Sequence, residues 1–381
     1  LFSKEVPTKK LNVHPLVSIV IPVYNEASTI QSTIDSILNL DYPHDKLQLI
    51  IVNDASTDDT KEIVKKHYPH LLFIDKKQNQ GKAAALNSAL DVARGDFFAC
   101  VDADSLVHPQ SLKKVIATFG DPAIASVISS IRVHHPKTFI ERLQWLEYIM
   151  SALVRKLMAK INVLFITPGV LSVYRTHILR DVGGFDKDNL TEDFEIALRL
   201  HKHLYAVTIE TDAVVYTKAP STFLDLFRQR IRWFRGFIFN TIKHKELFFN
   251  KKYGMLGTFQ LPVAVLSVFM LLTVSGIFGF KLFKKLYLLG LDLWSMGFDF
   301  FRLFELPQVL TLLNLDFFLL FPIVLTLLGA LYFFYRAHKT LKERFIYPLT
   351  FVLYLFYFGF LQATCWTAAF LKEATKSKRK W

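Results

Sequence analysis

Val17-Ser-Ile-Val-Ile-Pro-Val-Tyr24 is an almost uninterrupted apolar run near the start of the chain, and it decides the fold. A run without polar alternation is typical of a strand buried on both faces of a parallel sheet. Similar runs follow at 47–52, 71–74 and 97–101, and helical patterns separate them at 27–40, 58–67 and 82–94. This alternation predicts an α/β fold with a doubly wound, mostly parallel sheet.

Acidic residues follow two of these predicted strands directly. Asn53 and Asp54 come after the second strand, and Asp102-Ala103-Asp104 closes the fourth. In open α/β sheets ligands bind beyond the carboxyl ends of the strands, where Tyr24 also stands. Two neighbouring carboxylates can hold one divalent cation, and hard oxygen ligands suit Mg²⁺ or Mn²⁺. Asp, Ser and Thr are also ordinary turn and capping residues, so a purely structural role for both segments stays open.

The starts of two predicted helices carry further charged residues. Gly81 and Lys82 open a helix whose amide groups favour anions, so Lys82 is either a phosphate contact or a solvated lysine. Thr191-Glu192-Asp193 opens another helix, where the dipole alone explains the carboxylates. A general base at Asp193 would need burial or the charge of Glu192 to raise its pKa.

A second kind of motif lies on a predicted amphipathic helix at 221–249. Gln229, Arg232 and Trp233 stand at i, i+3 and i+4, which places them on one helix face. Arg can clamp a phosphate through two hydrogen bonds, and Trp offers a flat surface to a sugar ring. A lipid-facing helix uses the same residue types, so that interpretation stays open. This helix and another at 136–162 are predicted to lie in a membrane interface, with a core-facing position as the alternative.

The last third of the chain is strongly apolar. Stretches at 255–280, 309–334 and 345–371 each exceed the roughly 20 apolar residues that cross a bilayer, which predicts three transmembrane helices. The stretch at 281–308 is expected to be interfacial, re-entrant or a fourth span. Two cysteines make no disulfide framework, and both Cys100 and Cys365 are expected to be buried. The globular half is therefore expected in a reducing compartment.

The composition excludes several classes of protein. The formal charge of +13 requires an anionic partner, but no nucleic-acid-binding signature is present, so we expect none. Basic residues crowd the flanks of the apolar block, which favours anionic lipid headgroups and a pyrophosphate substrate. The sequence also lacks the glycine-rich dinucleotide fingerprint, the P-loop, zinc-ligand spacing and the Gly-x-Ser-x-Gly hydrolase motif.

The motifs, taken in order along the chain, resemble the inverting family 2 glycosyltransferases. The matching segments are Pro22-Val-Tyr-Asn-Glu26, Asn53-Asp54, Asn79-Gln-Gly-Lys82, Asp102-Ala-Asp104, Thr191-Glu-Asp193 and Gln229-x-x-Arg232-Trp233. The similarity is greatest to the membrane-bound processive branch, which includes hyaluronan, chitin, poly-N-acetylglucosamine and cellulose synthases. Two segments depart from the family pattern. Asn53 stands where many relatives have Asp, and Thr167-Pro-Gly replaces a Ser-Gly-Pro order.

The resemblance implies a GT-A-type fold and a role for each matching residue. Tyr24, Glu26 and Asp54 would hold the nucleotide, and Lys82 would approach the diphosphate. Asp102 would contact donor ribose or phosphate, and would hold Mg²⁺ or Mn²⁺ together with Asp104. Asp193, with Glu192 beside it, would be the general base. Gln229, Arg232 and Trp233 would cover the diphosphate and stack the terminal sugar of the acceptor.

These expectations give a hypothesis for the whole chain. An extension at 1–16 precedes a cytoplasmic catalytic domain at 17–220, an interfacial helix at 221–250, a transmembrane region at 255–371 and a basic tail at 372–381. We expect a multi-pass protein of the plasma membrane that transfers sugar from a UDP-sugar, first UDP-N-acetylglucosamine, to a growing polysaccharide. The alternatives are transfer of one sugar to a lipid acceptor, such as a polyprenyl phosphate or ceramide, and an inactive carbohydrate-binding scaffold.

Overall fold

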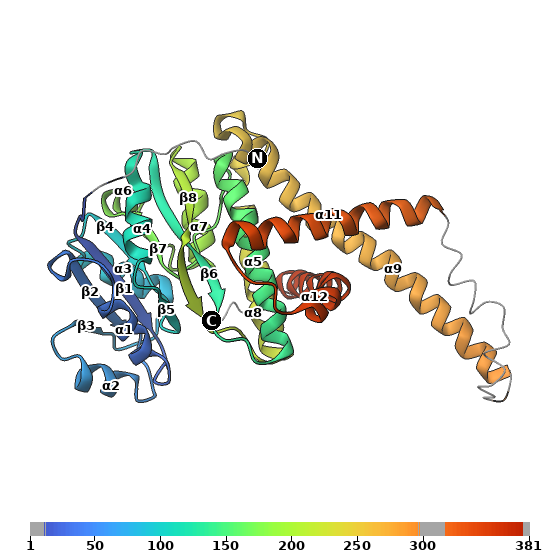
Figure 1. Ribbon diagram of the computed structural model, residues 1–381, viewed down its shortest axis with the longest axis horizontal. Coiled ribbons are helices and arrows are strands. Elements are labelled where there is room, and N and C mark those ends of the chain that lie inside the picture. The colour runs from blue at the N-terminus through green and yellow to red at the C-terminus, as the bar shows by residue number, and fades with distance from the viewer. Residues whose placement is uncertain (1–10, 12, 296, 298–316, 376–381) are drawn as a thin grey trace.

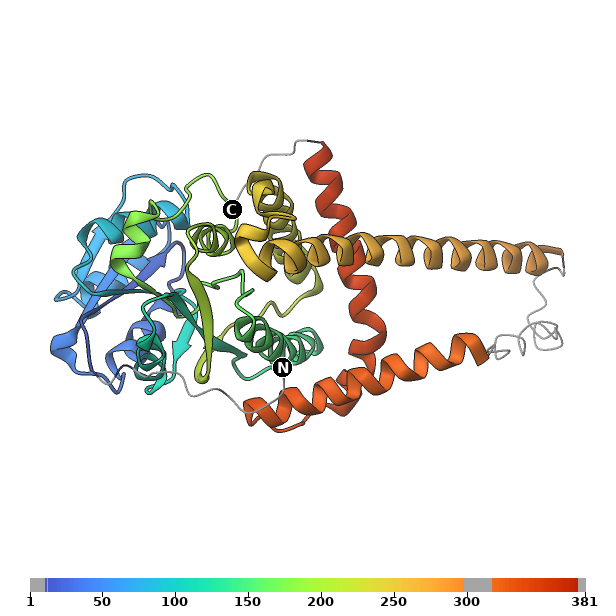
Figure 2. The same ribbon diagram turned by 90° about the horizontal axis from the view of Figure 1, so that it is seen from above.

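The computed structural model describes residues 11, 13–295, 297 and 317–375. An α/β body forms one end of the molecule, and long helices extend from the other end (Figure 1). The two ends are joined by helices that lie between the sheet and the extended part (Figure 2).

The first half of the body contains the predicted βα units. The strands are β1 (Val17–Val23), β2 (Leu47–Asn53), β3 (Leu72–Asp75) and β4 (Phe97–Cys100). The helices between them are α1 (Ile30–Leu38), the short η1 (His44–Lys46), α2 (Thr60–His67) and α3 (Lys82–Val92). All neighbouring strands here are parallel, in the order β3-β2-β1-β4. The predicted α/β fold is confirmed, with strand bounds that differ by one residue or less.

Alternation along β1 explains why its sequence is apolar at all positions except Ser18. Ile19 and Ile21 belong to the hydrophobic cluster under α1, whereas Val20 belongs to the cluster under α3. Successive side chains of a strand point to opposite faces of the sheet, so helices on both faces require apolar residues at nearly every position.

The second half of the sheet is mixed, and of its elements the sequence predicted only the helix opened by Thr191-Glu192-Asp193. The elements are β5 (Ser105–Val107), α4 (Ser111–Ala117), η2 (Thr118–Gly120), β6 (Ile124–Val133), β7 (Ser172–Arg175), α6 (Thr176–Asp181), α7 (Glu192–Lys202) and β8 (Ala206–Thr217). Strand β7 runs antiparallel to both β4 and β6, β5 runs antiparallel to β8, and β6 and β8 are parallel. The full order is β3-β2-β1-β4-β7-β6-β8-β5.

Two long amphipathic helices connect the body to the C-terminal part. They are α5 (Phe139–Lys160) and α8 (Phe223–Lys243). The side chain of Thr138 accepts from the amide of Glu141, whose own side chain accepts from the Thr138 amide, and this capping box starts α5. Leu146 and Ile149 of α5 pack with Phe334 and Phe351 of the C-terminal helices. Each helix therefore has protein partners, and its location in a membrane interface stays a prediction.

The C-terminal part consists of short turns and three long helices. These are η3 (Lys245–Leu247), η4 (Lys251–Tyr253), the π-helical η5 (Leu256–Gln260), α9 (Leu261–Ser295), α11 (Phe317–Leu341) and α12 (Pro348–Ala374). Helices α9 and α11 project from the body, whereas α12 runs across them and packs on α8, α9 and α5 (Figure 2). Cys100 and Cys365 are both buried and unpaired, as expected.

One described helix, Leu256–Ser295, is long and apolar enough to cross a membrane. A second qualifies only if Pro348–Leu355 and Tyr357–Ala374, which are bent by 49° at their junction, count as one span. Residues 309–316 of the expected middle span lie outside the described residues, as do most of 296–308. Residues 281–295 continue α9 as one helix. The expected three or four spans stay a prediction.

Candidate active site

Two adjoining cavities lie beyond the carboxyl ends of β1, β2 and β4. The first, the strand-end cavity, has a volume of about 610 Å³ and is lined by residues that include Tyr24, Glu26, Asp54, Asn79, Gly81, Lys82, Asp102, Asp104 and Arg232. The second, the helix-walled cavity, has a volume of about 430 Å³ and is lined by residues that include Glu147, Tyr148, Arg155, Glu192, Asp193, Gln229, Arg230, Trp233, Lys218, Gln362 and Trp366.

Four predicted site residues line both cavities. They are Lys82, Asp102, Asp104 and Arg232. All eleven predicted site residues therefore lie around two connected spaces, although they come from six separate segments of sequence. The volumes are those of small-molecule sites.

Asp54 is held by the loop that leads into α3. Its carboxylate accepts from Lys76 Nζ at 2.5 Å, from the Gln80 amide at 3.1 Å and from the Gly81 amide at 2.7 Å. The side chain is 5% exposed, so these bonds fix the start of α3 and with it Lys82. The neighbouring Asn53 donates to Asp75 Oδ1 at 2.8 Å. A contact between Asp54 and a nucleotide stays a prediction.

Lys82 lies at the junction of the two cavities. Its Nζ is 2.5 Å from Asp102 Oδ1 and 3.3 Å from Glu192 Oε1. Burial would lower the pKa of Lys82, but the charges of Asp102 and Glu192 outweigh burial and raise it. The ammonium group is therefore charged at neutral pH, in a position to face an incoming anion.

Gly169, which lies in the turn at 167–169, contacts the Lys82–Asp102 pair where the two cavities meet. A Cβ at this position would lie 2.2 Å from Lys82 Nζ and 2.7 Å from Asp102 Oδ1. Only glycine allows the backbone to approach the ion pair this closely. The Thr-Pro-Gly segment, which the sequence identified only through a resemblance, is thus part of the wall.

Asp104 lies near two other acidic groups, the carboxylates of Asp102 and Glu26. Burial, followed by the charges of Asp102 and Glu26, raises the pKa of Asp104 to about 6, against the opposing effects of Ser105 and Lys82. Among the described residues no three His, Cys, Asp or Glu side chains are grouped as a complete metal site. Mg²⁺ and Mn²⁺ sites of this class use one or two protein carboxylates and complete the shell with substrate phosphates and water. The donor set of Asp104 and Asp102 fits that requirement.

Asp193 stands in the first turn of α7, at the wall of the helix-walled cavity. Burial raises its pKa to about 7, and Glu192 raises it too, against the opposing effects of Lys82, the Phe194 amide and Arg232. Both conditions that the sequence analysis required of a base, burial and the charge of Glu192, are therefore met. The Asp193 carbonyl also accepts from Thr167 Oγ1 at 2.7 Å, which joins Asp193 to the Thr-Pro-Gly turn.

The Gln-x-x-Arg-Trp box faces the cavities as its spacing predicted. Gln229 and Trp233 line the helix-walled cavity, and Arg232 lines both. The sequence analysis missed Arg230, which lies between them. Its Nη2 is 2.7 Å from Glu147 Oε2 of α5, and its guanidinium covers the Trp233 ring at 4.2 Å from the centroid. One face of Trp233 is therefore already occupied.

Helix α8 is fastened to the start of α7. A Cβ on Gly236 would lie 2.2 Å from Thr191 Oγ1, so the two backbones are in close approach. Next to this contact, Asn189 and Asn240 exchange hydrogen bonds at 2.6 and 3.1 Å, and Asn240 also donates to Thr191 Oγ1 at 3.1 Å. These contacts hold the start of α7, which carries Asp193, against the helix that carries the Gln-x-x-Arg-Trp box.

Helix α12 contributes Gln362 and Trp366 to the helix-walled cavity, which the sequence analysis did not predict. Trp366 stacks on Phe234 of α8 with ring centroids 4.1 Å apart and planes 3° apart. Arg235 Nε lies 2.6 Å from Glu373 Oε1 and anchors the end of α12 on α8. No local pattern could reveal these contacts, because the two helices are far apart in sequence.

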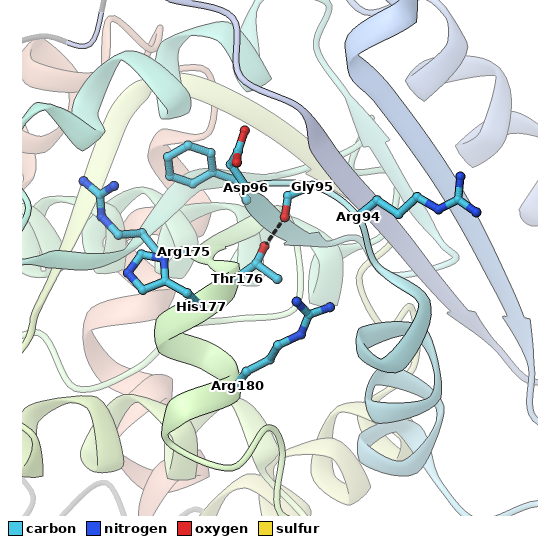
Figure 3. Close-up of a pocket in the computed structure, with 8 residues that line it drawn as sticks. Arg94, Gly95, Asp96, Arg175, Thr176, His177 and Arg180 are labelled. Carbon is cyan, nitrogen blue, oxygen red and sulfur yellow. Dashed lines mark hydrogen bonds between the residues drawn. The ribbon is translucent and has the colours of Figure 1, made fainter.

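A third cavity, of about 400 Å³, lies at the amino end of β4, away from these residues (Figure 3). Two of its three arginines are engaged in the fold. Arg180 donates to the carbonyls of Leu90 and Ala93 at the end of α3, and Arg175 donates to the carbonyls of Phe119 and Ile124. Thr176 Oγ1 donates to the Gly95 carbonyl at 2.6 Å, as Figure 3 shows. We interpret this cavity as structural.

Comparison with known proteins finds matches to part of the chain, chiefly its N-terminal part. A family model described as glycosyl transferase family 2 matches residues 18–183. A poly-beta-1,6-N-acetyl-D-glucosamine synthase from Staphylococcus epidermidis is 32% identical over 246 residues, which cover 61% of this chain and 58% of that protein. A synthase of the same name from Staphylococcus aureus (strain COL) is 30% identical over 232 residues, which cover 59% of this chain and 56% of that protein. The chain thus matches less than two thirds of the length of these relatives.

A solved structure shares the fold. The mannosyltransferase PcManGT from Pyrobaculum calidifontis, in complex with GDP-Man and Mn²⁺, superposes with a TM-score of 0.53. It is 27% identical in sequence, and the match covers 63% of this chain and 66% of that one.

Proposed function

Residues 18–183 match the glycosyl transferase family 2 model, and from that match we propose that the chain transfers a sugar from a nucleotide sugar to a growing β-linked polysaccharide. UDP-N-acetylglucosamine is the proposed donor, because the two staphylococcal relatives are named as poly-N-acetylglucosamine synthases. One observation carries the proposal. A carboxylate with a pKa of about 7, Asp193, faces a cavity that meets a second, carboxylate- and lysine-lined cavity at Lys82 and Arg232.

We assign the nucleotide sugar to the strand-end cavity. Tyr24, Glu26 and Asp54 line its outer part and would contact the nucleoside, while Lys82 and Arg232 line the part shared with the other cavity. Two cations at this junction suit a diphosphate, whose charge increases as the sugar departs. The sugar would then lie at the junction, with its anomeric carbon toward Asp193.

A divalent cation fits beside this diphosphate. Asp104 and Asp102 would hold it. The raised pKa of Asp104 reflects burial and then the carboxylates of Asp102 and Glu26, whose negative charge such a cation would offset. The solved mannosyltransferase contains Mn²⁺, which supports a divalent metal in this chain, and we propose Mg²⁺ or Mn²⁺. Bound there, the ion would neutralise charge on the leaving diphosphate.

Asp193 is the proposed general base. Its carboxylate would take the proton of an acceptor hydroxyl while the hydroxyl oxygen forms a bond to the anomeric carbon. The bond between that carbon and the diphosphate oxygen breaks, and its electron pair leaves with the nucleoside diphosphate. A single displacement of this kind inverts the configuration, so an α-linked donor gives a β-linked product. A pKa near 7 is suited to a base that works at neutral pH.

We further propose that the chain is an integral membrane protein with its catalytic domain, residues 17–220, on the cytoplasmic side. The support is α9, whose described side chains are mostly exposed although the helix is apolar. A helix that is hydrophobic all round requires an apolar environment. The basic residues of α8 would then lie near anionic headgroups.

A donor screen tests the proposal. The purified full chain in detergent would be incubated with Mn²⁺ and, separately, with UDP-N-acetylglucosamine, UDP-glucose and GDP-mannose, and the products would be analysed by mass spectrometry. We expect a ladder of N-acetylhexosamine oligomers from the first donor. A single sugar on a co-purified lipid would contradict polymer synthesis, and no transfer from any donor would contradict the enzymatic proposal altogether.

A further inference from the structure

A buried carboxylate on α7 joins that helix to the end of α8. Glu195 is 1% exposed and stands two residues after Asp193, so the two side chains leave nearly opposite sides of the helix. Its Oε1 lies 3.6 Å from Nζ of Lys243, the last residue of α8, and 3.2 Å from Nε2 of His244, the C-cap. One turn of α7 therefore carries both the proposed base and a contact with α8.

Hydrogen bonds hold Glu195 and His244 in this contact. Arg199, one turn further along α7, donates two hydrogen bonds to the Glu195 carboxylate. Burial would raise the pKa of Glu195, but the hydrogen bonds from His244 and Arg199 outweigh burial and lower it, so the carboxylate is charged at neutral pH. The other ring nitrogen of His244, Nδ1, is buried and hydrogen-bonds to no described residue. The bond to Glu195 is therefore the polar contact that accounts for the buried position of the His244 ring.

Arg199 extends the contact to a turn that also holds α3. Its Nη1 donates to the Val182 carbonyl at 2.6 Å. The chain then turns at residues 183–184, two glycines whose φ angles of 89° and 68° favour glycine. Asn87 of α3 exchanges two hydrogen bonds with the backbone of Phe185, at 2.7 and 2.8 Å. Helices α3 and α7 are therefore fastened to the same turn.

The three helices that this network joins carry predicted site residues. Lys82 opens α3, Asp193 lies in the first turn of α7, and the Gln-x-x-Arg-Trp box lies within α8. Neither Glu195 nor Arg199 is among the described residues that line the strand-end cavity or the helix-walled cavity. An effect of Glu195 on the reaction would therefore act through the positions of other residues.

We propose that Glu195 is a positioning residue, which with Arg199 and His244 fixes the orientation of α7 against α3 and α8. It thereby sets where Asp193 stands relative to Lys82 and the Gln-x-x-Arg-Trp box. The inference rests on the proposed function, because that function makes Asp193 the base. A displacement of about 1 Å at a reacting group costs about 10²-fold in rate, so a small rotation of α7 would slow transfer.

Removal of the charge at Glu195 tests the proposal. Glu195→Gln keeps the size of the side chain but replaces the carboxylate that Arg199 and His244 share. We expect kcat for sugar transfer to fall by about 10- to 100-fold, with the KM for the nucleotide sugar within about twofold of wild type. Glu195→Asp, which keeps the charge, should recover part of the lost kcat. Wild-type kcat in Glu195→Gln, or no recovery in Glu195→Asp, would overturn the proposal.

A second readout separates positioning from a loss of folded protein. The quantity is the nucleoside diphosphate released per sugar incorporated into product. A smaller folded fraction lowers release and incorporation in proportion, so the ratio stays the same. In Glu195→Gln we expect the ratio to rise, because water competes with an acceptor hydroxyl that Asp193 no longer meets in the right place. An unchanged ratio would show that Glu195 only stabilises the fold, and would overturn the proposal.

Lys202→Gln is the matched control. Lys202 also lies on α7, and its Nζ is 2.7 Å from Glu246 Oε1 in η3, directly after α8. The two side chains are 42% and 41% exposed, and exposed ion pairs contribute little. Lys202→Gln should therefore keep the wild-type kcat and the wild-type ratio. A loss of kcat as large as that in Glu195→Gln would mean that the effect does not belong to Glu195, and would contradict its assignment.

Hydrogen exchange separates this inference from the proposed function. In the full chain in detergent, Glu195→Gln should make amide exchange about tenfold faster in α7 and in the last turns of α8, and leave β1, β2 and β4 unchanged. If the wild type transfers no sugar, the function is wrong, and unchanged exchange in α7 and α8 would still overturn the role of Glu195. If the wild type transfers sugar and Glu195→Gln matches it, the positioning role is wrong and the function stands.

Discussion

The strand-end cavity and the helix-walled cavity share four residues but are assembled in different ways. The first is built from segments that directly follow β1, β2 and β4, so chain order and sheet topology fix its wall. The second is built where α5, α7, α8 and α12 pack together, and its wall depends on contacts between distant segments. The difference suggests a division of roles between the two cavities. The strand-end cavity would bind and activate the donor, and the helix-walled cavity would bind the acceptor. Each prediction below tests that division.

Replacement of Asp193, the proposed base, should have the largest effect. Asp193→Asn keeps the size of the side chain but removes its ability to take a proton, and we expect transfer to fall by about 10³-fold. The rate of sugar incorporation from labelled donor measures this. Asp188→Asn, an exposed aspartate before the same helix, is the control and should retain full activity. Activity of Asp193→Asn within tenfold of wild type would remove Asp193 from the role of base.

Loss of Asp104, the proposed metal ligand, should have the next largest effect. Asp104→Asn leaves one carboxylate for the cation, and we expect about a 10²-fold lower rate at limiting Mn²⁺, with partial recovery as Mn²⁺ is raised. Treatment of the wild type with EDTA should give a similar loss that added Mn²⁺ reverses. A variant with the same Mn²⁺ dependence as the wild type would contradict the assignment of Asp104.

Gly169→Ala tests the junction between the cavities. The new methyl group would overlap Lys82 Nζ and Asp102 Oδ1, which are the mobile ends of side chains, so the ion pair should shift while the fold survives. We expect about a tenfold lower rate with a melting temperature within a few degrees of wild type. Gly276→Ala on α9 is the control, since a Cβ there meets nothing within 4 Å. A fully active Gly169→Ala would mean that the ion pair is not needed in its observed position.

The pH dependence should be the smallest effect. Burial, followed by the charge of Glu192, raises the pKa of Asp193 to about 7, so the carboxyl group is increasingly protonated and inactive as the pH falls. We expect kcat at saturating donor and metal to fall by about threefold between roughly pH 7.5 and 6.5. Asp104, with a pKa of about 6, should begin to lose Mn²⁺ to protons only at lower pH. A rate that stays constant or rises over this interval would contradict an ionised Asp193 as the base.

Sequence reasoning succeeded where chemistry and secondary structure are set by neighbours in the chain. The apolar runs identified β1, β2 and β4, and therefore placed Asp54, Asp102 and Asp104 at one edge of the sheet. Helical spacing likewise placed Gln229, Arg232 and Trp233 on one face. The sequence analysis left the role of Asp54 open between ligand contact and turn. Its bonds to Lys76, Gln80 and Gly81 give it a definite structural role.

Sequence reasoning failed where a feature depends on packing between distant segments. The strands β6, β7 and β8 were not predicted, and neither was the antiparallel pairing of β7 that brings the 167–169 turn to the Lys82–Asp102 pair. The role of Arg230 was missed because it depends on Glu147 of α5, and the contribution of Trp366 depends on how α12 docks. No local pattern encodes either contact.

The division of roles between the cavities can be tested by titrating UDP in the presence of Mn²⁺ into the wild type, Asp193→Asn and Asp104→Asn by calorimetry. Asp193 lines only the helix-walled cavity, whereas Asp104 lines both. We expect Asp193→Asn to bind UDP as tightly as the wild type and Asp104→Asn to lose the Mn²⁺-dependent part of the affinity. Equal weakening in both variants, or in neither, would contradict a separate site for the donor at the strand ends.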